Sequence, residues 1–189
     1  DECVRFDPGQ RLRKAARGRA RAGPGSTRPR MRTLTVCNFV TVDGRYEDDT
    51  HDIASFFEHH HPDYDGADSF DFYTTALLRD SDALLLSGRR SALGNLEYWT
   101  GVQGNPDATA IRREFAALIL HVEKIVVSDT ITDADVAPYR NVRIVRIADS
   151  AAEVAALKAS AGRGILILLG RVLWNHLMHE GLVDELHLV

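Results

Sequence analysis

The chain has 189 residues and is 44% hydrophobic, which is ample for one folded domain, and no apolar run approaches the roughly 20 residues of a membrane-spanning helix. The formal net charge of −4 argues against nucleic acid as the main partner. The two cysteines, Cys3 and Cys37, are too few for a disulfide framework, which fits a cytoplasmic protein.

Residues 1–30 form a basic extension that differs in composition from the rest of the chain. They carry nine Lys and Arg against three Asp and Glu, a net charge of +6, whereas the remainder has a net charge of −10. This segment is rich in Arg, Gly and Pro, so we expect it to be disordered. A nucleic-acid-binding arm, an organellar transit segment and a non-native or dispensable tail all remain open. Residues 31–189 are predicted to be the folded domain.

The domain opens with a strand pattern and an acidic, aromatic stretch. Residues 33–42, TLTVCNFVTV, are rich in β-branched and apolar side chains and predict a central strand that ends at Asp43-Gly44. Ile53, Phe56 and Phe57 then indicate a short helix. Three adjacent histidines, residues 59–61, lack the spacing of metal ligands, so a solvated loop and no metal site are expected.

The next helix and strand lead to a glycine followed by two arginines. Ser69 is a candidate cap for a helix whose shared apolar face is predicted to hold Phe72, Tyr73, Ala76 and Leu77. Residues 84–86, three leucines, indicate a buried strand that ends at Gly88. Glycine allows close approach of a ligand there, and Arg89 and Arg90 supply forked donors suited to phosphate. Ordinary surface arginines are the alternative interpretation.

Two further strands and an amphipathic helix follow. Asn105-Pro106 has the pattern of a helix start, and the spacing of Ile111, Phe115, Leu118 and Ile119 predicts an apolar helix face. Residues 124–127, KIVV, indicate a strand that ends at Ser128-Asp129, and residues 142–147 indicate another strand.

The last third of the sequence repeats the alternation of helix and strand. Ser150 and Glu153 have capping-box spacing ahead of a helix that Gly162 is expected to end. Residues 165–169, ILILL, predict a central strand ending at Gly170. The helix up to Gly181 is expected to bury Val172, Leu173 and Leu177, and residues 182–189 enter a final strand.

Three of the predicted strands therefore end in turns suited to a ligand. These turns begin at Ser87, Ser128 and Gly170. Ligands of α/β sheets bind outside the carboxyl ends of the strands, so the three turns are expected to line one cleft. The positive charge of the arginines would suit a ligand that carries phosphate.

Several motifs in this order resemble the dihydrofolate reductase superfamily. They are NFVTVDGRYED, the stretch from Asp82 to Ser91, KIVVSDT, ILILLG and EGLVDELHL. The nearest branch is the one related to the reductase domain of riboflavin biosynthesis, and the resemblance covers residues 32–189. It implies a three-layer α/β fold with a mostly parallel, mixed central sheet flanked by helices. It also implies an oxidoreductase that uses NADPH to reduce a small heterocyclic or ribosylamine-type substrate, a pterin or a riboflavin precursor such as 5-amino-6-(5-phosphoribosylamino)uracil.

The resemblance also implies roles for individual residues. The adenine-side phosphates of NADPH would lie against a first group, with Arg89 or Arg90 on the 2′-phosphate: Gly88, Arg89, Arg90, Ser91 and Ser128. The pyrophosphate would face Gly170 and the helix start after it, Arg171 and Val172. Thr41, Asp43 and Gly44 would lie beside the nicotinamide and the substrate. By location, Asp43 and Asp52 are the candidate proton sources, with turn formation or helix capping as the alternative for both.

Three departures from the family pattern keep a second function open. Gly170-Arg171-Val172 replaces a run of small residues, and Asp129 adds a carboxylate near the expected 2′-phosphate, which bears on the choice between NADPH and NADH. The strands that usually follow VDELHL are not in this sequence, so an unpaired sheet edge would favour a homodimer or lower the stability. A non-catalytic nucleotide-binding or dimerisation relative is therefore the alternative to a reductase.

Overall fold

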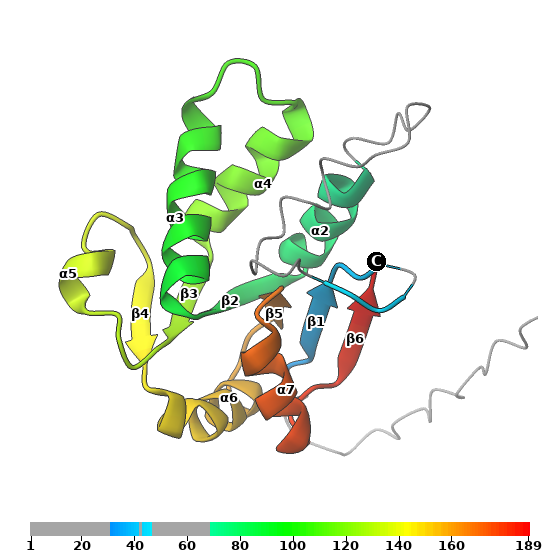
Figure 1. Cartoon of the computed structure of the whole chain (residues 1–189), viewed down its shortest axis with the longest axis vertical. Coiled ribbons are helices and arrows are strands. Elements are labelled where there is room, and N and C mark those ends of the chain that lie inside the picture. The colour runs from blue at the N-terminus through cyan, green and yellow to red at the C-terminus, as the bar shows by residue number, and fades with distance from the viewer. Residues whose placement is uncertain (1–30, 42, 47–68) are drawn as a thin grey trace, which may run out of the picture.

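The computed structural model describes residues 31–41, 43–46 and 69–189 (Figure 1). The expected basic extension, the predicted helix near Phe56, the three histidines and Asp52 lie outside these residues. The elements in chain order are β1 (Leu34–Asn38), α2 (Ser69–Arg79), β2 (Ser81–Ser87), α3 (Arg89–Gly104), α4 (Ala110–His121), β3 (Glu123–Val127), α5 (Asp133–Val136), β4 (Val142–Val145), a 3-10 turn (Ile147–Asp149), α6 (Ser150–Ala159), β5 (Gly164–Leu168), α7 (Arg171–His179) and β6 (Glu185–Leu188).

The strands form one six-stranded sheet in the order β4-β3-β2-β5-β1-β6. Every strand pairing in the described part of the chain is parallel, so the predicted parallel sheet is confirmed, without the antiparallel strand that a mixed sheet would need. The apolar run of β5 lies between β2 and β1, as expected for a central strand. Its residues Ile165, Leu166 and Ile167 are fully buried because both faces of the sheet are covered.

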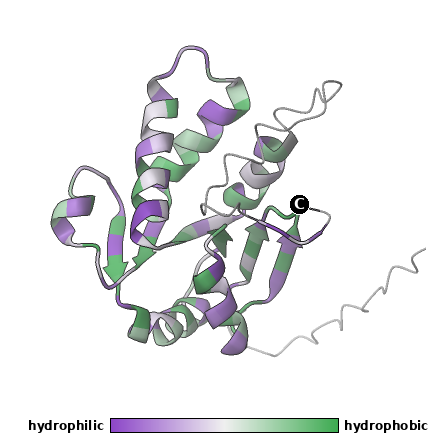
Figure 2. Cartoon of the chain, in the orientation of Figure 1, coloured by the Kyte–Doolittle hydropathy of each residue, from purple (hydrophilic) through white to green (hydrophobic). Residues whose placement is uncertain are grey.

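Two apolar layers separate the sheet from the helices on either side (Figures 1 and 2). On one face, Leu84 and Leu86 of β2 pack with side chains of α2, α3 and α4, among them Phe115. On the other face, Leu85 packs with α6 and α7, which contribute Val154, Leu173 and Leu177 to that cluster. Alternate residues of one strand therefore belong to opposite layers, which is the three-layer α/β fold that the sequence predicted.

The buried faces of two helices differ from the predicted ones. In α2 the buried positions include Thr74, Thr75 and Leu78, whereas Phe72 is 60% exposed. The two threonine hydroxyls donate to backbone carbonyls of the preceding turn, so these residues are buried without an unpaired hydroxyl. In α7 the prediction was correct for its leucines and wrong for Val172, which is 77% exposed.

One predicted helix start and one predicted capping box are also wrong. The Oδ1 atom of Asn105 accepts a hydrogen bond from the backbone N–H of Asp107 at 2.9 Å, so Asn105 forms a turn and α4 begins at Ala110. Helix α6 does begin at Ser150, but the Ser150 hydroxyl donates to the Ile147 carbonyl at 2.7 Å and Glu153 forms an ion pair with Arg143 at 2.6 Å, so the two residues form no capping box.

Charged side chains link neighbouring segments at the amino ends of the strands through ion pairs and hydrogen bonds. The buried guanidinium of Arg32 forms an ion pair with Asp82 and donates to the carbonyl of Arg163 at 2.9 Å. On the α6 side, Lys158 Nζ donates to Asp184 Oδ2 and to the carbonyl of Leu182, both at 2.6 Å. These bonds join β2, β5, α6 and the approach to β6 at one edge of the sheet. Among the described residues, no helix is both long and apolar enough to cross a membrane.

Candidate nucleotide site at the carboxyl edge of the sheet

The three turns predicted to line one cleft follow three neighbouring strands. Strands β3, β2 and β5 are adjacent and parallel, so the turns that begin at Ser128, Ser87 and Leu169 leave the sheet at the same edge. The sequence argument is confirmed on this point, because parallel strands bring their carboxyl ends together.

A topological switch lies between β2 and β5. Helix α3 follows β2 and packs through Ala92 and Leu96 on one face of the sheet. Helix α7 follows β5 and packs through Leu173 and Leu177 on the opposite face. The N-termini of both helices therefore lie at the carboxyl ends of the strands, one on each face of the sheet. This is the arrangement in which α/β sheets bind nucleotides.

Each of these helices begins directly after a glycine with a positive φ angle. Gly88 has φ +72° and caps α3, and Gly170 has φ +71° and caps α7. A Cβ atom at Gly88 would meet nothing within 4 Å, so this turn has open space beside its backbone. At Gly170 a Cβ would lie 2.9 Å from the Ser87 hydroxyl oxygen. The turns after β2 and β5 thus contact each other, and Gly170 permits that contact.

Arg89 is held by an acidic side chain from the segment after β3. Its guanidinium makes two hydrogen bonds to the carboxylate of Asp135, at 2.9 and 2.5 Å, and one to the carbonyl of Thr130 at 2.9 Å. The same carboxylate accepts from the backbone and hydroxyl of Thr132, which completes a capping box on α5. These donors, Arg89 first, hold the pKa of Asp135 well below its usual value. Arg90 and Ser91 follow as exposed residues in the first turn of α3.

Ser128 is buried and shapes the turn after β3. Its hydroxyl oxygen accepts the backbone N–H groups of Thr130 and Ile131, each at 3.2 Å. The next residue, Asp129, accepts the backbone N–H of Ile147 at 3.0 Å. In this structure Ser128 therefore fixes the turn that supports Arg89, while the carboxylate of Asp129 bonds to the segment after β4.

The turn after β1 contains the predicted residues Thr41, Asp43 and Gly44. The Thr41 hydroxyl donates to the Asp43 carboxylate, and Gly44 N–H donates to the Thr41 carbonyl at 2.8 Å. The hydroxyl contact, then a hydrogen bond from the backbone N–H of Asp43 and last the charge of Arg45 lower the pKa of Asp43, which is exposed. Asp43 therefore takes part in this turn, and its role as a proton source stays a prediction.

Arg171 links the start of α7 to this turn. Its guanidinium carbon lies 4.8 Å from the centre of the Tyr46 ring, so the cation stacks on the aromatic face. Val172 is exposed beside it. The structure thus brings Arg171 and the segment after β1 together at the carboxyl edge, next to the switch between β2 and β5.

Sequence reasoning missed two features at the ends of β1 and β6. Asn38, the last residue of β1, is 1% exposed, and its amide nitrogen and oxygen have no hydrogen-bond partner among the described residues. On α2, the hydroxyl of Tyr73 lies 2.7 Å from Nδ1 of His187 on β6. The alternation in ELHL, with Glu185 and His187 on one strand face, was a local signal of this polar surface.

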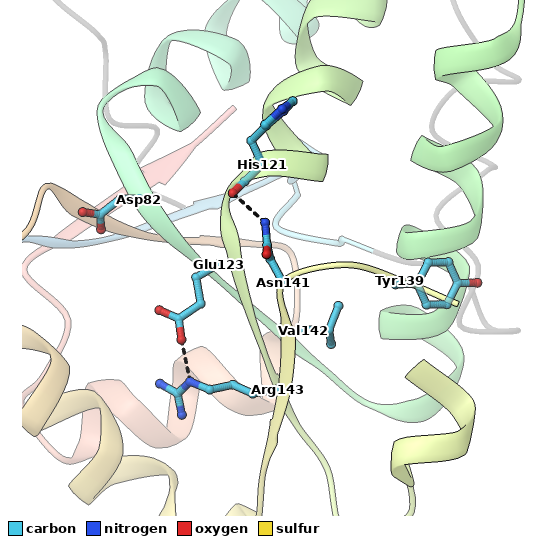
Figure 3. Close-up of a pocket in the computed structure, with 7 residues that line it drawn as sticks. All are labelled: Asp82, His121, Glu123, Tyr139, Asn141, Val142 and Arg143. Carbon is cyan, nitrogen blue, oxygen red and sulfur yellow. Dashed lines mark hydrogen bonds and ion pairs between the residues drawn. The ribbon is translucent and has the colours of Figure 1, made fainter. Parts of the chain in front are cut away.

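A shallow surface pocket of about 560 Å³ lies at the opposite end of the sheet (Figure 3). Glu123 begins β3 and Val142 begins β4, so this pocket is at the amino ends of the strands. Its charged groups already have partners, since Arg143 bonds to Glu123 at 2.6 Å, and Asn141 Nδ2 donates to the His121 carbonyl at 3.1 Å. The carboxyl edge is therefore the better candidate for a functional site.

Comparisons with known proteins identify the family of the chain. The family model of the RibD C-terminal domain matches residues 32–189. Among solved structures, a Shewanella sp. PV-4 protein named for riboflavin biosynthesis has a TM-score of 0.49 and 16% sequence identity, covering 82% of this chain and 75% of the other. At this level the structural likeness alone carries no functional argument. None of the curated proteins compared matches the chain.

Proposed function

Because the chain belongs to the RibD C-terminal domain family, we propose that it is an NADPH-dependent reductase of a small heterocyclic or ribosylamine-type substrate, of the riboflavin-precursor or pterin class. The observation that carries the proposal is the switch between β2 and β5. There the N-termini of α3 and α7 approach one edge from opposite faces, each after a glycine with positive φ. When bound, the reduced nicotinamide supplies the hydride for such a reaction.

The residues at this edge fit a phosphate-bearing cofactor. Helix N-termini carry partial positive charge and backbone N–H groups without intrahelical partners, which together favour an anion. The open space at Gly88 leaves room for a phosphate against the backbone of α3. Arg89 is 48% exposed in its side chain and already makes a forked contact with the Asp135 carboxylate, a geometry that a phosphate also satisfies. We infer that Gly88, Arg89, Arg90 and Ser91 hold the adenine-side phosphates.

The remaining predicted residues take supporting roles in this proposal. Ser128 holds the turn behind Arg89, and the start of α7 at Gly170, Arg171 and Val172 faces the pyrophosphate. Arg171, stacked on Tyr46, orders the segment after β1, so that Thr41 and Gly44 line the nicotinamide end. Asp43 is less suited to donate a proton, because its lowered pKa leaves it as a carboxylate at neutral pH.

The competing function is a relative that binds a nucleotide or a second copy without catalysis. One observation favours a relative that does not bind NADPH: the Asp135 carboxylate occupies the guanidinium fork of Arg89 and would have to give way to a 2′-phosphate. The two functions differ in what they predict for cofactor preference and hydride transfer, so one experiment separates them.

The test is a titration of the full chain with NADPH and with NADH, followed by quenching of tryptophan fluorescence. The backbone N–H of Trp174 donates to the Gly170 carbonyl at 3.2 Å, so this residue lies in the turn of α7 next to the proposed site. We expect saturable binding that favours NADPH, with the quenching lost in Trp174→Phe and kept in Trp99→Phe. Consumption of NADPH with 5-amino-6-(5-phosphoribosylamino)uracil then establishes catalysis. Binding without turnover, or no binding by a folded chain, contradicts the reductase.

A further inference from the structure

Three side chains from two elements form a hydrogen-bonded series on one face of the sheet. The hydroxyl of Tyr73 lies 2.7 Å from His187 Nδ1, and His187 Nε2 lies 3.3 Å from Glu185 Oε2. A carboxylate accepts hydrogen bonds only, so Nε2 carries the hydrogen in that contact and Nδ1 is left to face the phenol. The series Glu185, His187, Tyr73 is therefore directional, ending at a phenolic hydroxyl.

The contact between Tyr73 and His187 lies near the carboxyl ends of β1 and β6, whereas Glu185 is the first residue of β6. In the register of the two strands, Thr35 pairs with Glu185 and Cys37 pairs with His187. Leu34 and Val36 of β1 belong to the apolar layer under α6 and α7, so the alternate residues of the strand, and their partners on β6, face the α2 side. The Tyr73 hydroxyl contacts His187 from α2, on that same side.

The neighbouring surface is aromatic and open to a ligand. The rings of Phe39, just after β1, and Phe70, on the first turn of α2, have centroids 3.6 Å apart. Tyr73 is 41% exposed, so a bound molecule at this edge can reach its hydroxyl. Two strand spacings, about 10 Å, separate the boundary of β2 and β5 from the boundary of β1 and β6. A dinucleotide laid along the edge from the α3 turn spans that separation.

The fold itself gains little from these contacts. Hydrogen bonds and ion pairs between partly exposed groups contribute little net stability, and Glu185 and Tyr73 are both exposed. Helix α2 is held on the sheet by its buried side, including Leu78 in the apolar layer. Because stability does not explain these contacts, we consider a role for Glu185, His187 and Tyr73 in the reaction itself.

We propose that Tyr73 is the proton donor of the reductase, with His187 and Glu185 as its positioning residues. This proposal rests on the proposed reductase function and assigns the proton donor, which that function left unassigned. Reduction of a C=N bond, such as that of an open-chain ribosylamine, adds to carbon a hydride that the reduced nicotinamide supplies, and adds a proton to nitrogen. Tyr73 gives its hydroxyl proton to that nitrogen, while His187 Nδ1, 2.7 Å away, holds the phenolic oxygen in place. The phenolate then takes a proton from solvent, so the products are the amine, the oxidised nicotinamide and Tyr73 with its proton restored.

The experiment compares Tyr73→Phe with Tyr98→Phe in the full chain. Phenylalanine keeps each ring and removes one hydroxyl, and Tyr98 is an exposed residue of α3 on which Arg112 stacks. With NADPH and 5-amino-6-(5-phosphoribosylamino)uracil, Tyr73→Phe should lower kcat by about 10²- to 10⁴-fold, the usual contribution of a general acid. Its KM should stay within about threefold, because substrate binding does not depend on the proton. His187→Gln should lower kcat in the same way, and Tyr98→Phe should match the wild type.

A second measurement does not depend on turnover. In NMR spectra of the chain, the Cε1–H signal of His187, identified by its loss in His187→Gln, should shift when 5,6-diaminouracil is added with NADP⁺. Tyr73→Phe should greatly reduce that shift. If Tyr73→Phe keeps the wild-type kcat, Tyr73 is not the proton donor, whereas the proposed reductase function is unaffected. If the wild type turns over neither this uracil nor a pterin, the reductase is wrong. The NMR result then decides whether Tyr73 and His187 contact a ligand: a shift supports that contact, and an unmoved signal overturns it.

Discussion

Replacement of Gly170 by alanine tests the contact that joins the turns after β2 and β5. Two costs are expected. The left-handed backbone at φ +71° is unfavourable for alanine by about 1–2 kcal/mol. The new Cβ would lie 2.9 Å from the Ser87 hydroxyl oxygen, and moving that side chain off its preferred rotamer adds about 0.5–1.5 kcal/mol. The free energy of unfolding should therefore fall by about 1.5–3.5 kcal/mol.

Gly181→Ala is the matched control for the backbone cost. Gly181 has φ +67°, and a Cβ there would meet nothing within 4 Å. Urea denaturation should show a smaller loss for Gly181→Ala than for Gly170→Ala, with unchanged m-values. In a Ser87→Ala background the two glycine variants should cost the same. Equal costs in the wild-type background would refute the reasoning, because they would mean that the Ser87 contact carries no strain.

Three further predictions follow from the charged and buried groups. Arg89→Ala should weaken NADPH binding by about 10- to 100-fold and NADH binding much less. Asp135→Asn should raise the affinity for NADPH relative to that for NADH, because it weakens the ion pair that competes for Arg89. Equal losses for both nucleotides in a titration of Arg89→Ala contradict the phosphate role of Arg89. Burial lowers the pKa of Lys124 to about 8, so the folded chain binds fewer protons than the unfolded chain between pH 8 and 10.5. Relative to Lys124→Met, the wild-type free energy of unfolding should rise across that window by up to about 3 kcal/mol, and parallel curves from chemical denaturation count against it. Burial also raises the pKa of Cys37 to about 11, so in a Cys3→Ser variant the thiol should react with Ellman's reagent only after unfolding, and fast reaction of the folded chain disproves this.

The strands were predictable because their apolar runs are continuous and their order along the chain alternates with helices. Residues 84–86 and 165–167 are buried on both faces of the sheet, so no alternation obscures them. The buried face of α2 was not predictable from hydropathy. Thr74 and Thr75 satisfy their hydroxyls on their own helix and can therefore be buried, while Phe72 is left exposed.

The candidate site divides in the same way. The turns that follow the strands, with Gly88 and Gly170, were predicted because a glycine after an apolar run is a local signal. The bond between Arg89 and Asp135 joins residues 46 positions apart, and that between Tyr73 and His187 joins residues 114 positions apart. Only the packing of helices on the sheet brings these partners together, so local sequence patterns do not predict these two contacts.

The charged bonds at the amino edge have a consequence for how this protein tolerates change. Arg32 contacts Asp82 and the carbonyl of Arg163, and Lys158 contacts Asp184, so single substitutions at that edge disturb several segments at once. The turns at the carboxyl ends of the strands are not part of these contacts, so substitutions in them leave the bonds of Arg32 and Lys158 intact. A mutant library randomised at Arg90, Ser91 and Val172 should therefore retain mostly folded members, and one randomised at Arg32 and Lys158 should not. Variants with a new cofactor preference should therefore be easiest to obtain at these positions, because substitutions there cost the least stability.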